Sequence, residues 1–177
     1  VAKLEFAAFD GCKSLETLEV SEDHANFSIK DGILFSKDME LLFVPQALVN
    51  GEYAVPEGTR SIADGAFKEC DRLTSVKIPD SVVSIGSGTF EKCKKLQSVI
   101  LPSSINTINS KLFYDCSNLS SISIPPSVIA IGESAFCKCR KLVSIELPVG
   151  ITSIAHHLFE LCKSLEIISI PKTVTSI

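Results

Sequence analysis

The sequence predicts a repeat solenoid, in which coils of equal length stack along one axis. Three sets of identical residues recur with a period of 23 and support this prediction. They are phenylalanines (Phe67, Phe90, Phe113, Phe136 and Phe159), cysteines three positions behind them (Cys70, Cys93, Cys116, Cys139 and Cys162) and prolines (Pro56, Pro79, Pro102, Pro125, Pro148 and Pro171). Identical residues at a fixed interval indicate that each interval folds into the same unit and packs against its neighbours.

The period and the repeated residue types narrow the fold class. A period between 20 and 29 residues, with Leu and Ile at fixed offsets, is typical of a leucine-rich repeat solenoid. We expect a right-handed solenoid of the β-rich α/β type, in which each 23-residue coil contributes one short parallel strand. Segments such as LTSVKIP and LVSIELP alternate apolar and polar residues before a proline that ends the strand. The spacing between Phe and Cys suits one helical or 3-10 turn that points both side chains inward, where the phenylalanines would stack.

These signals describe one domain, residues 1–177, in four parts. Phe9 and Cys12 repeat the coil offsets, so residues 1–20 are interpreted as a partial coil. Residues 21–55 are interpreted as an insertion, 56–170 as five full coils and 171–177 as the start of a further coil. We number the full coils coil 1 (56–78), coil 2 (79–101), coil 3 (102–124), coil 4 (125–147) and coil 5 (148–170).

The insertion has its own pattern. Two apolar runs, 33–35 and 41–44, flank the polar residues 36–38 and predict a β-hairpin packed on the first coils. The chain starts without Met and stops within a repeat, so we expect a piece of a longer protein. An unfinished coil exposed at both ends would favour end-to-end self-association.

Composition argues against two classes of partner. The net charge of −4 and the pI near 5.4 lack the basic excess that binding to nucleic acid requires. No apolar run approaches the 18 residues of a membrane span, which argues against membrane insertion.

The cysteines and histidines predict no catalytic or metal site. Six of the seven cysteines occupy one repeat position, where a small buried hydrophobe fits, so we expect reduced core thiols. The seventh, Cys137, is expected to be an exposed free thiol, and its spacing from Cys139 is not that of a zinc site. His156 and His157 are expected at the surface. We therefore expect no metal, no cofactor and no enzymatic activity.

The coils IPDSVVSIGSGTFEKCKKLQSV and IPPSVIAIGESAFCKCRKLVSI resemble the BspA-type leucine-rich repeats of bacterial and protozoan surface proteins. The resemblance covers nearly the whole chain. It implies a cell-surface or secreted protein that binds host or extracellular-matrix proteins by adhesion, and the family pattern includes no catalytic residues.

A protein partner is expected on the outward side of the main strand, on a continuous concave face. Two columns of side chains form this face: Thr17, Ser75, Ser98, Ser121, Ser144 and Ile167 in the first, and Glu19, Lys77, Ile100, Ser123, Glu146 and Ser169 in the second. No aromatic or Arg anchor occurs in either column, so these residues could also be ordinary surface side chains of a strand. Two further functions stay open: an intracellular interaction scaffold, and a structural spacer without a ligand.

Overall fold

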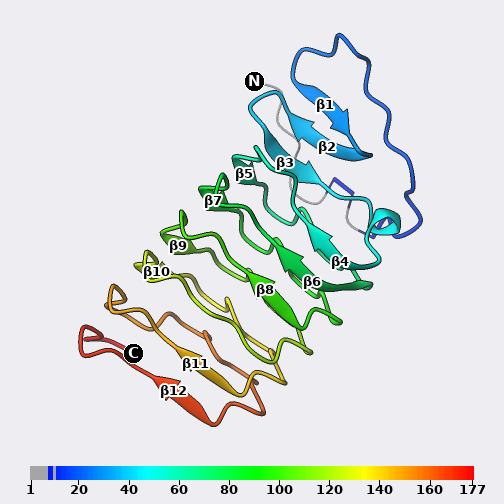
Figure 1. Cartoon of the computed structure of the whole chain (residues 1–177). Helices are drawn as coiled ribbons and strands as arrows, with labels where there is room; N and C mark the ends of the chain where they lie inside the picture. The colour runs from blue at the N-terminus through cyan, green and yellow to red at the C-terminus, as the bar shows by residue number, and fades with distance from the viewer. Residues whose placement is uncertain (1–7, 10) are drawn as a thin grey trace.

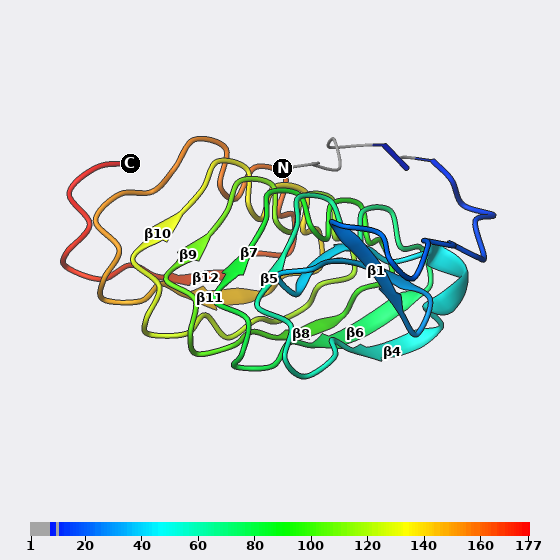
Figure 2. The same cartoon turned by 90° about the horizontal axis from the view of Figure 1, so that it is seen from above.

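The computed structural model describes residues 8, 9 and 11–177, and it forms a stack of coils that runs from one end of the molecule to the other (Figure 1). Residues 1–7 and 10 of the predicted partial coil lie outside the described residues. Viewed from above, the coils follow one another along the same axis (Figure 2). The predicted solenoid of 23-residue coils is confirmed.

Two series of short strands run along the stack. The main strands are β4 (Gly51–Ala54), β6 (Leu73–Lys77), β8 (Ser98–Ile100), β11 (Ser144–Glu146) and β12 (Ile167–Ser169). The second series consists of β3 (Glu40–Phe43), β5 (Ser61–Ile62), β7 (Ser84–Ile85), β9 (Thr107–Ile108) and β10 (Ala130–Ile131). In the main series, β4, β6 and β8 pair in parallel, and β11 pairs in parallel with β12. In the second series, β3, β5 and β7 pair in parallel, and β9 pairs in parallel with β10.

Strand pairing is interrupted between coils 2 and 3. Within the described residues, neither β7 nor β8 of coil 2 pairs with a strand of coil 3. The two coils are joined instead through their turns, where Phe90 N donates to Leu112 O at 3.0 Å and Lys92 N to Tyr114 O at 2.7 Å. A further backbone bond lies next to β8, where Ser120 N donates to Gln97 O at 3.4 Å. Turn bonds and this bond therefore join the two coils without strand pairing in the described residues.

The turn that carries Phe and Cys is not helical, which corrects the expected helical or 3-10 turn. In coil 1, Ala66 N donates to Ala63 O and Cys70 N donates to Phe67 O, at 3.3 and 3.1 Å. Between these bonds, Phe67 N and Glu69 N point to the next coil and donate to Thr89 O and Glu91 O, at 3.0 and 2.8 Å. A helix would direct every N–H along its own axis, whereas this turn sends alternate N–H groups to the neighbouring coil.

Left-handed backbone conformations make this alternation possible. Gly65 and Glu69 have φ of 66° and 59° in coil 1, and the same two positions have positive φ in every later full coil. Coils 3, 4 and 5 place Lys111, Ser134 and His157 where coils 1 and 2 have glycine. These non-glycine residues carry the conformational strain of the left-handed region.

The core is a row of stacked phenylalanine rings. Ring centroids from Phe67 to Phe159 are 5.3, 5.6, 5.6 and 6.0 Å apart along the stack. The rings of Phe67, Phe90, Phe113 and Phe136 are fully buried. Tyr53 extends the row with an edge contact to Phe67 at 5.3 Å. The expectation that Phe and Cys both point inward is confirmed for coils 1 to 4.

The segment before coil 1 contains the predicted hairpin and one strand more. β2 (Ile33–Ser36) pairs antiparallel with β3, as the two apolar runs predict, and β1 (Phe27–Lys30) adds a third strand to β2. Asp31 and Gly32 both have positive φ, the conformation of a two-residue type I′ hairpin turn. A short 3-10 helix, η1 (Gln46–Leu48), then leads to β4.

The two ends of the stack of full coils differ. Coil 1 is covered by the preceding segment, in which Leu41, Val49 and Val55 are buried, as the expected packing of the insertion on the first coils predicts. The partial coil expected at this end, residues 1–20, lies partly outside the described residues, so its exposure stays a prediction. At the other end, Ile168 is 37% exposed, although its equivalents Val76 and Ile145 are 2% and 3% exposed. The last coil therefore presents part of its inward side to solvent.

Candidate interaction surface

The main strands place most of the predicted columns side by side. Ser75 and Lys77 of β6 lie next to Ser98 and Ile100 of β8, and the two residues of each pair are in parallel register. The same register holds further along the stack, where Ser144 and Glu146 of β11 lie next to Ile167 and Ser169 of β12. Parallel in-register pairing places equivalent side chains at about 4.8 Å from one another.

The structure does not bring Thr17 and Glu19 into this face. Both are exposed and belong to no strand. Glu52 and Ala54 of β4 take the adjacent places instead, next to Ser75 and Lys77. Sequence reasoning missed these two residues because they fall in the predicted insertion. A signal was present, since Tyr53 and Val55 precede Pro56 with the spacing that Val76 and Ile78 have before Pro79.

Ser121 and Ser123 of coil 3 are exposed, but their segment forms no strand. The inward residues on either side, Ile122 and Ile124, are only partly buried, unlike Val99 in coil 2. The predicted face is therefore divided into one part on β4, β6 and β8 and another on β11 and β12.

Two apolar side chains stand out on this face. Ile100 is 60% exposed and Ile167 is 61% exposed. Exposed isoleucine on a strand has no role in the core of the coil that carries it, so it is available for contact with a partner. Lys77 adds a positive charge to this face, and Glu52 and Glu146 add negative charges.

The core cysteines form hydrogen bonds that the sequence did not predict. The thiols of Cys93, Cys116 and Cys162 each donate to the carbonyl oxygen of the phenylalanine in the preceding coil, with Sγ to O distances of 3.0 Å. Cys139 makes the same bond to Phe113 at 3.2 Å. A hydrocarbon side chain could fill the same space but could not donate a hydrogen bond to the phenylalanine carbonyl oxygen. Cysteine therefore has an advantage at this position.

Burial keeps these thiols protonated. It raises the pKa of Cys93, Cys116 and Cys139 well above the usual value, that of Cys70 to about 12 and that of Cys162 to about 11. The described cysteines are all free thiols. Cys12 is exposed, so the offset that it shares with the core cysteines does not place it in the core.

Cys137 is buried, at 2% exposure, so the expectation of an exposed thiol is wrong. Its Sγ lies 3.8 Å from Glu160 Oε2 of the next coil. Burial and the Glu160 carboxylate raise the pKa of the Cys137 thiol. This is the opposite of what a nucleophilic cysteine needs, because such a residue is activated by a nearby cation.

His156 and His157 are exposed, as expected. Their ring centroids lie 3.7 Å apart, and His157 Nδ1 is 3.0 Å from Glu160 Oε2. Although they are adjacent in sequence, the turn brings the two rings together. In the part of the chain that the structure describes, no group of three or more His, Cys, Asp or Glu side chains is arranged to hold a metal ion.

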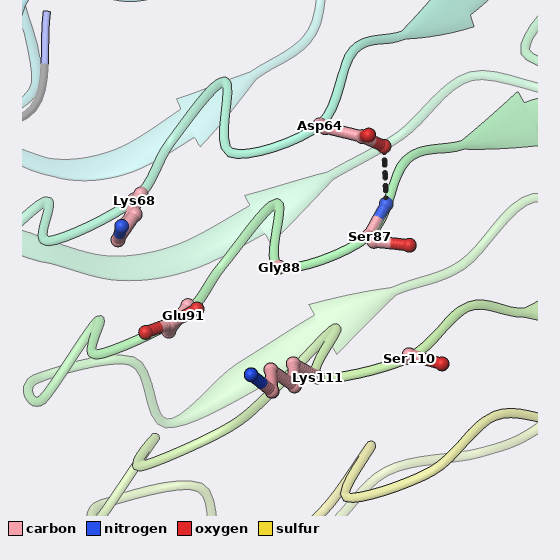
Figure 3. Close-up of a pocket in the computed structure, with 7 residues that line it drawn as sticks. All are labelled: Asp64, Lys68, Ser87, Gly88, Glu91, Ser110 and Lys111. Atoms are coloured by element: carbon pink, nitrogen blue, oxygen red, sulfur yellow. Dashed lines mark hydrogen bonds between the residues drawn. The ribbon is translucent and has the colours of Figure 1, made fainter. Parts of the chain in front are cut away.

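An open hollow lies over the turns of coils 1 to 3, away from the main-strand face (Figure 3). Its volume is about 460 Å³, and it is lined by Asp64, Lys68, Ser87, Gly88, Glu91, Ser110 and Lys111. Asp64 accepts a hydrogen bond from Ser87 N at 2.7 Å (Figure 3). No aliphatic or aromatic residue is among those that line it, whereas such residues are typical of a small-molecule pocket.

No helix among residues 8, 9 and 11–177 has the length and apolar character needed to cross a bilayer.

The 23-residue coils, parallel main strands and stacked core residues together define a protein of the leucine-rich repeat class. A model of the BspA type leucine rich repeat region matches residues 60–177 in six copies. The chain therefore belongs to the BspA-type leucine-rich repeat family.

Solved structures of bacterial leucine-rich repeat proteins share this fold. A leucine rich cell surface protein from Faecalibacterium prausnitzii is 34% identical with a TM-score of 0.84, over 92% of this chain and 43% of that one. The pneumococcal vaccine antigen PcpA is 26% identical with a TM-score of 0.78, over 90% of this chain and 44% of that one. The chain thus spans less than half the length of either protein. The comparison with curated proteins gave no match.

The family and its structural neighbours are typically non-enzymatic, and leucine-rich repeats generally mediate protein–protein interaction. The chain thus fits a protein-interaction module.

Proposed function

We propose that the chain is an adhesion module of a cell-surface or secreted protein, which binds a host or extracellular-matrix protein through its main-strand face. The observation that carries this proposal is the in-register row of exposed and half-buried side chains on β4, β6 and β8, with Ile100 at 60% exposure among them. The likeness to a leucine rich cell surface protein and to a pneumococcal vaccine antigen supports a surface location.

Binding of the purified chain to a panel of extracellular-matrix proteins tests the proposal. The informative variant replaces Lys77, Ile100 and Glu146 with serine, a residue that the same columns already contain. A matched control replaces Lys30, Val83 and Glu133 with serine, so that the same charges and one exposed apolar side chain are removed elsewhere. We expect saturable binding that is lost in the first variant and kept in the control.

The two other functions predict different results for binding, for the parent gene and for a variant with both columns changed to alanine. A folded chain that binds no matrix protein, and whose parent gene encodes no export signal, is expected of an intracellular scaffold. A spacer has no ligand on the main-strand face, so changing both columns to alanine is expected to leave all binding intact. Either result would replace the adhesion proposal.

We also propose end-to-end self-association that involves the C-terminal end of the stack. The support is the exposure of Ile168 and Ile170, at 37% and 48%, beside the edge of β12. An unpaired strand edge with apolar neighbours is a template for another chain. Light scattering over a range of concentrations is expected to show association that the substitution Ile168→Lys removes; a monomer at every concentration would contradict it.

A further inference from the structure

A ridge of positive charge runs along the turns that precede the main strands. In each full coil, two residues lie between the core cysteine and the following core leucine, and we call these ten positions the basic ridge. Six of the ten are Lys or Arg and one, Asp71, is acidic, in a chain with a net charge of −4. The six cations are Arg72, Lys94, Lys95, Arg140, Lys141 and Lys163.

The cations of the ridge are exposed, and no carboxylate of the described residues pairs with them. All six residues are exposed. Among the residues that the structure describes, none of the six has a carboxylate oxygen within 4.0 Å. The acidic residue of the ridge, by contrast, is neutralised, because Asp71 Oδ2 lies 2.8 Å from Lys13 Nζ. The positive charge is therefore available to a partner.

The backbone beneath the ridge is held in place. Asn118 Nδ2 donates to Lys94 O at 2.6 Å, and Ser164 N donates to Arg140 O at 3.1 Å. These bonds tie neighbouring coils together at the ridge, so the cations of coils 1, 2, 4 and 5 are spaced by whole multiples of the coil repeat. Four intervals of about 4.8 Å make the ridge roughly 19 Å long from coil 1 to coil 5.

The side chains of the ridge favour one kind of partner. None of the ten positions holds an aromatic or aliphatic residue. A folded protein partner usually needs such an anchor, and single-stranded nucleic acid needs aromatic rings for its bases to stack on. A straight row of flexible cations instead matches a linear polymer that carries anionic groups along its outside, as basic clusters match heparin.

We propose that the basic ridge binds a linear sulfated polysaccharide that lies along the axis of the solenoid. The overall negative charge does not oppose this, because at physiological ionic strength charges more than about 8 Å away are largely screened and the ridge dominates locally. The ridge is a different surface from the main-strand face, so this binding does not depend on the proposed adhesion to protein.

Heparin is the probe for the test, with binding measured by calorimetry at several salt concentrations. The ridge variant carries Lys94→Ser, Lys95→Asn, Arg140→Ser and Lys141→Asn. These are the residues, Ser117 and Asn118, that coil 3 has at the same two positions, so the fold tolerates them. The control carries Lys30→Ser, Lys37→Ser, Arg60→Ser and Lys172→Ser, which removes four exposed cations outside the ridge.

We expect the native chain to bind heparin with an affinity that falls as salt rises, because counterions are released. The ridge variant should bind about tenfold more weakly or worse, with a smaller salt slope, and the control should bind like the native chain. Equal losses in the two variants would overturn the proposal, since net charge alone would then explain binding. Equal affinity for polyglutamate or single-stranded DNA would also overturn it in favour of a general polyanion site. Matrix-protein binding of the ridge variant, measured in parallel, reports on the proposed function separately.

Discussion

At the scale of single residues, cysteine and phenylalanine act as a pair that links one coil to the next. The phenylalanine ring fills the core, and its carbonyl oxygen accepts both the backbone N–H of its own coil and the thiol of the following coil. In coils 2 and 3, Phe90 O accepts from Cys93 N at 3.1 Å and from Cys116 Sγ at 3.0 Å. The thiol thus satisfies the second lone pair of a buried oxygen.

The substitution Cys116→Ala tests this role. It removes the thiol donor and leaves a small cavity, so we expect the free energy of unfolding to fall by about 1–2 kcal/mol in urea denaturation. Cys12→Ala is the control, since exposed positions usually change stability by about 0.5 kcal/mol or less. Equal effects of the two substitutions would argue against a role for the buried thiol.

At the scale of elements, the turn carries as much of the fold as the strands do. Its alternate N–H groups bond within a coil and between coils, and its two left-handed residues allow this. The strands are short and their pairing is interrupted, whereas the turn bonds recur from coil 1 to coil 5. This turn also places the phenylalanine rings in their stack.

The ring stack gives a prediction that depends on position. Phe113 is fully buried between Phe90 and Phe136, with centroids 5.6 Å away on both sides. We expect Phe113→Ala to lower the free energy of unfolding by about 3–5 kcal/mol. Phe159 is only partly buried and stacks on one ring among the described residues, so Phe159→Ala should cost about half as much. Chemical denaturation of the two variants measures the difference, and equal costs would contradict the continuous stack.

Close packing of the coils gives a second prediction at this scale. A Cβ atom added to Gly86 would lie 2.4 Å from Asp64 N, a backbone atom of the preceding coil that cannot move aside. Gly86→Ala should therefore cost about 1–3 kcal/mol of stability. Thermal unfolding followed by circular dichroism is the measurement, and an unchanged melting temperature would show that the coils can separate at this point without cost.

At the scale of the whole molecule, the buried thiols make stability depend on alkaline pH. The thiols of an unfolded chain ionise near their usual pKa of about 8.5, whereas burial raises the pKa of Cys70 in the folded chain to about 12 and those of Cys93, Cys116 and Cys139 well above the usual value. The unfolded chain thus releases protons first as pH rises. Stability should be complete below about pH 8 and should fall as pH rises above it.

Urea denaturation between pH 7 and pH 10 tests this dependence. Each buried thiol should contribute a loss on the order of 1 kcal/mol by pH 10. A double variant, Cys93→Ala with Cys116→Ala, should be less stable at pH 7 but lose less stability between pH 7 and pH 10. Parallel curves for the native chain and the double variant would mean that the thiols do not cause the dependence.

The repeat, its inward residues and most of the main-strand columns could be predicted from the sequence. With a period of 23, the same positions are buried and the same positions face outward in every coil. Three features could not be predicted. The turn looked helical because a Phe–Cys spacing of three is compatible with both a helix and a pair of turns, and only backbone φ separates them. Glu52 and Ala54 were missed because β4 lacks the Phe and Cys of a full coil. Cys137 is expected at the surface because Glu91 and Tyr114 occupy its position in other coils. The Cys side chain is smaller than Glu or Tyr, so neighbouring residues can cover it.

The interrupted pairing between coils 2 and 3 has a mechanical consequence. The hydrogen bonds between coils point along the axis of the stack, so a pull on the two ends loads the interfaces in series, and each interface carries the same force. Such a series yields at its weakest interface. Coils 2 and 3 are joined by turn bonds, side-chain bonds, the backbone bond from Ser120 N to Gln97 O and the contact of Phe90 with Phe113, without strand pairing in the described residues. Under tension the molecule should therefore open first at this interface, which divides it into two segments that each keep their own strands.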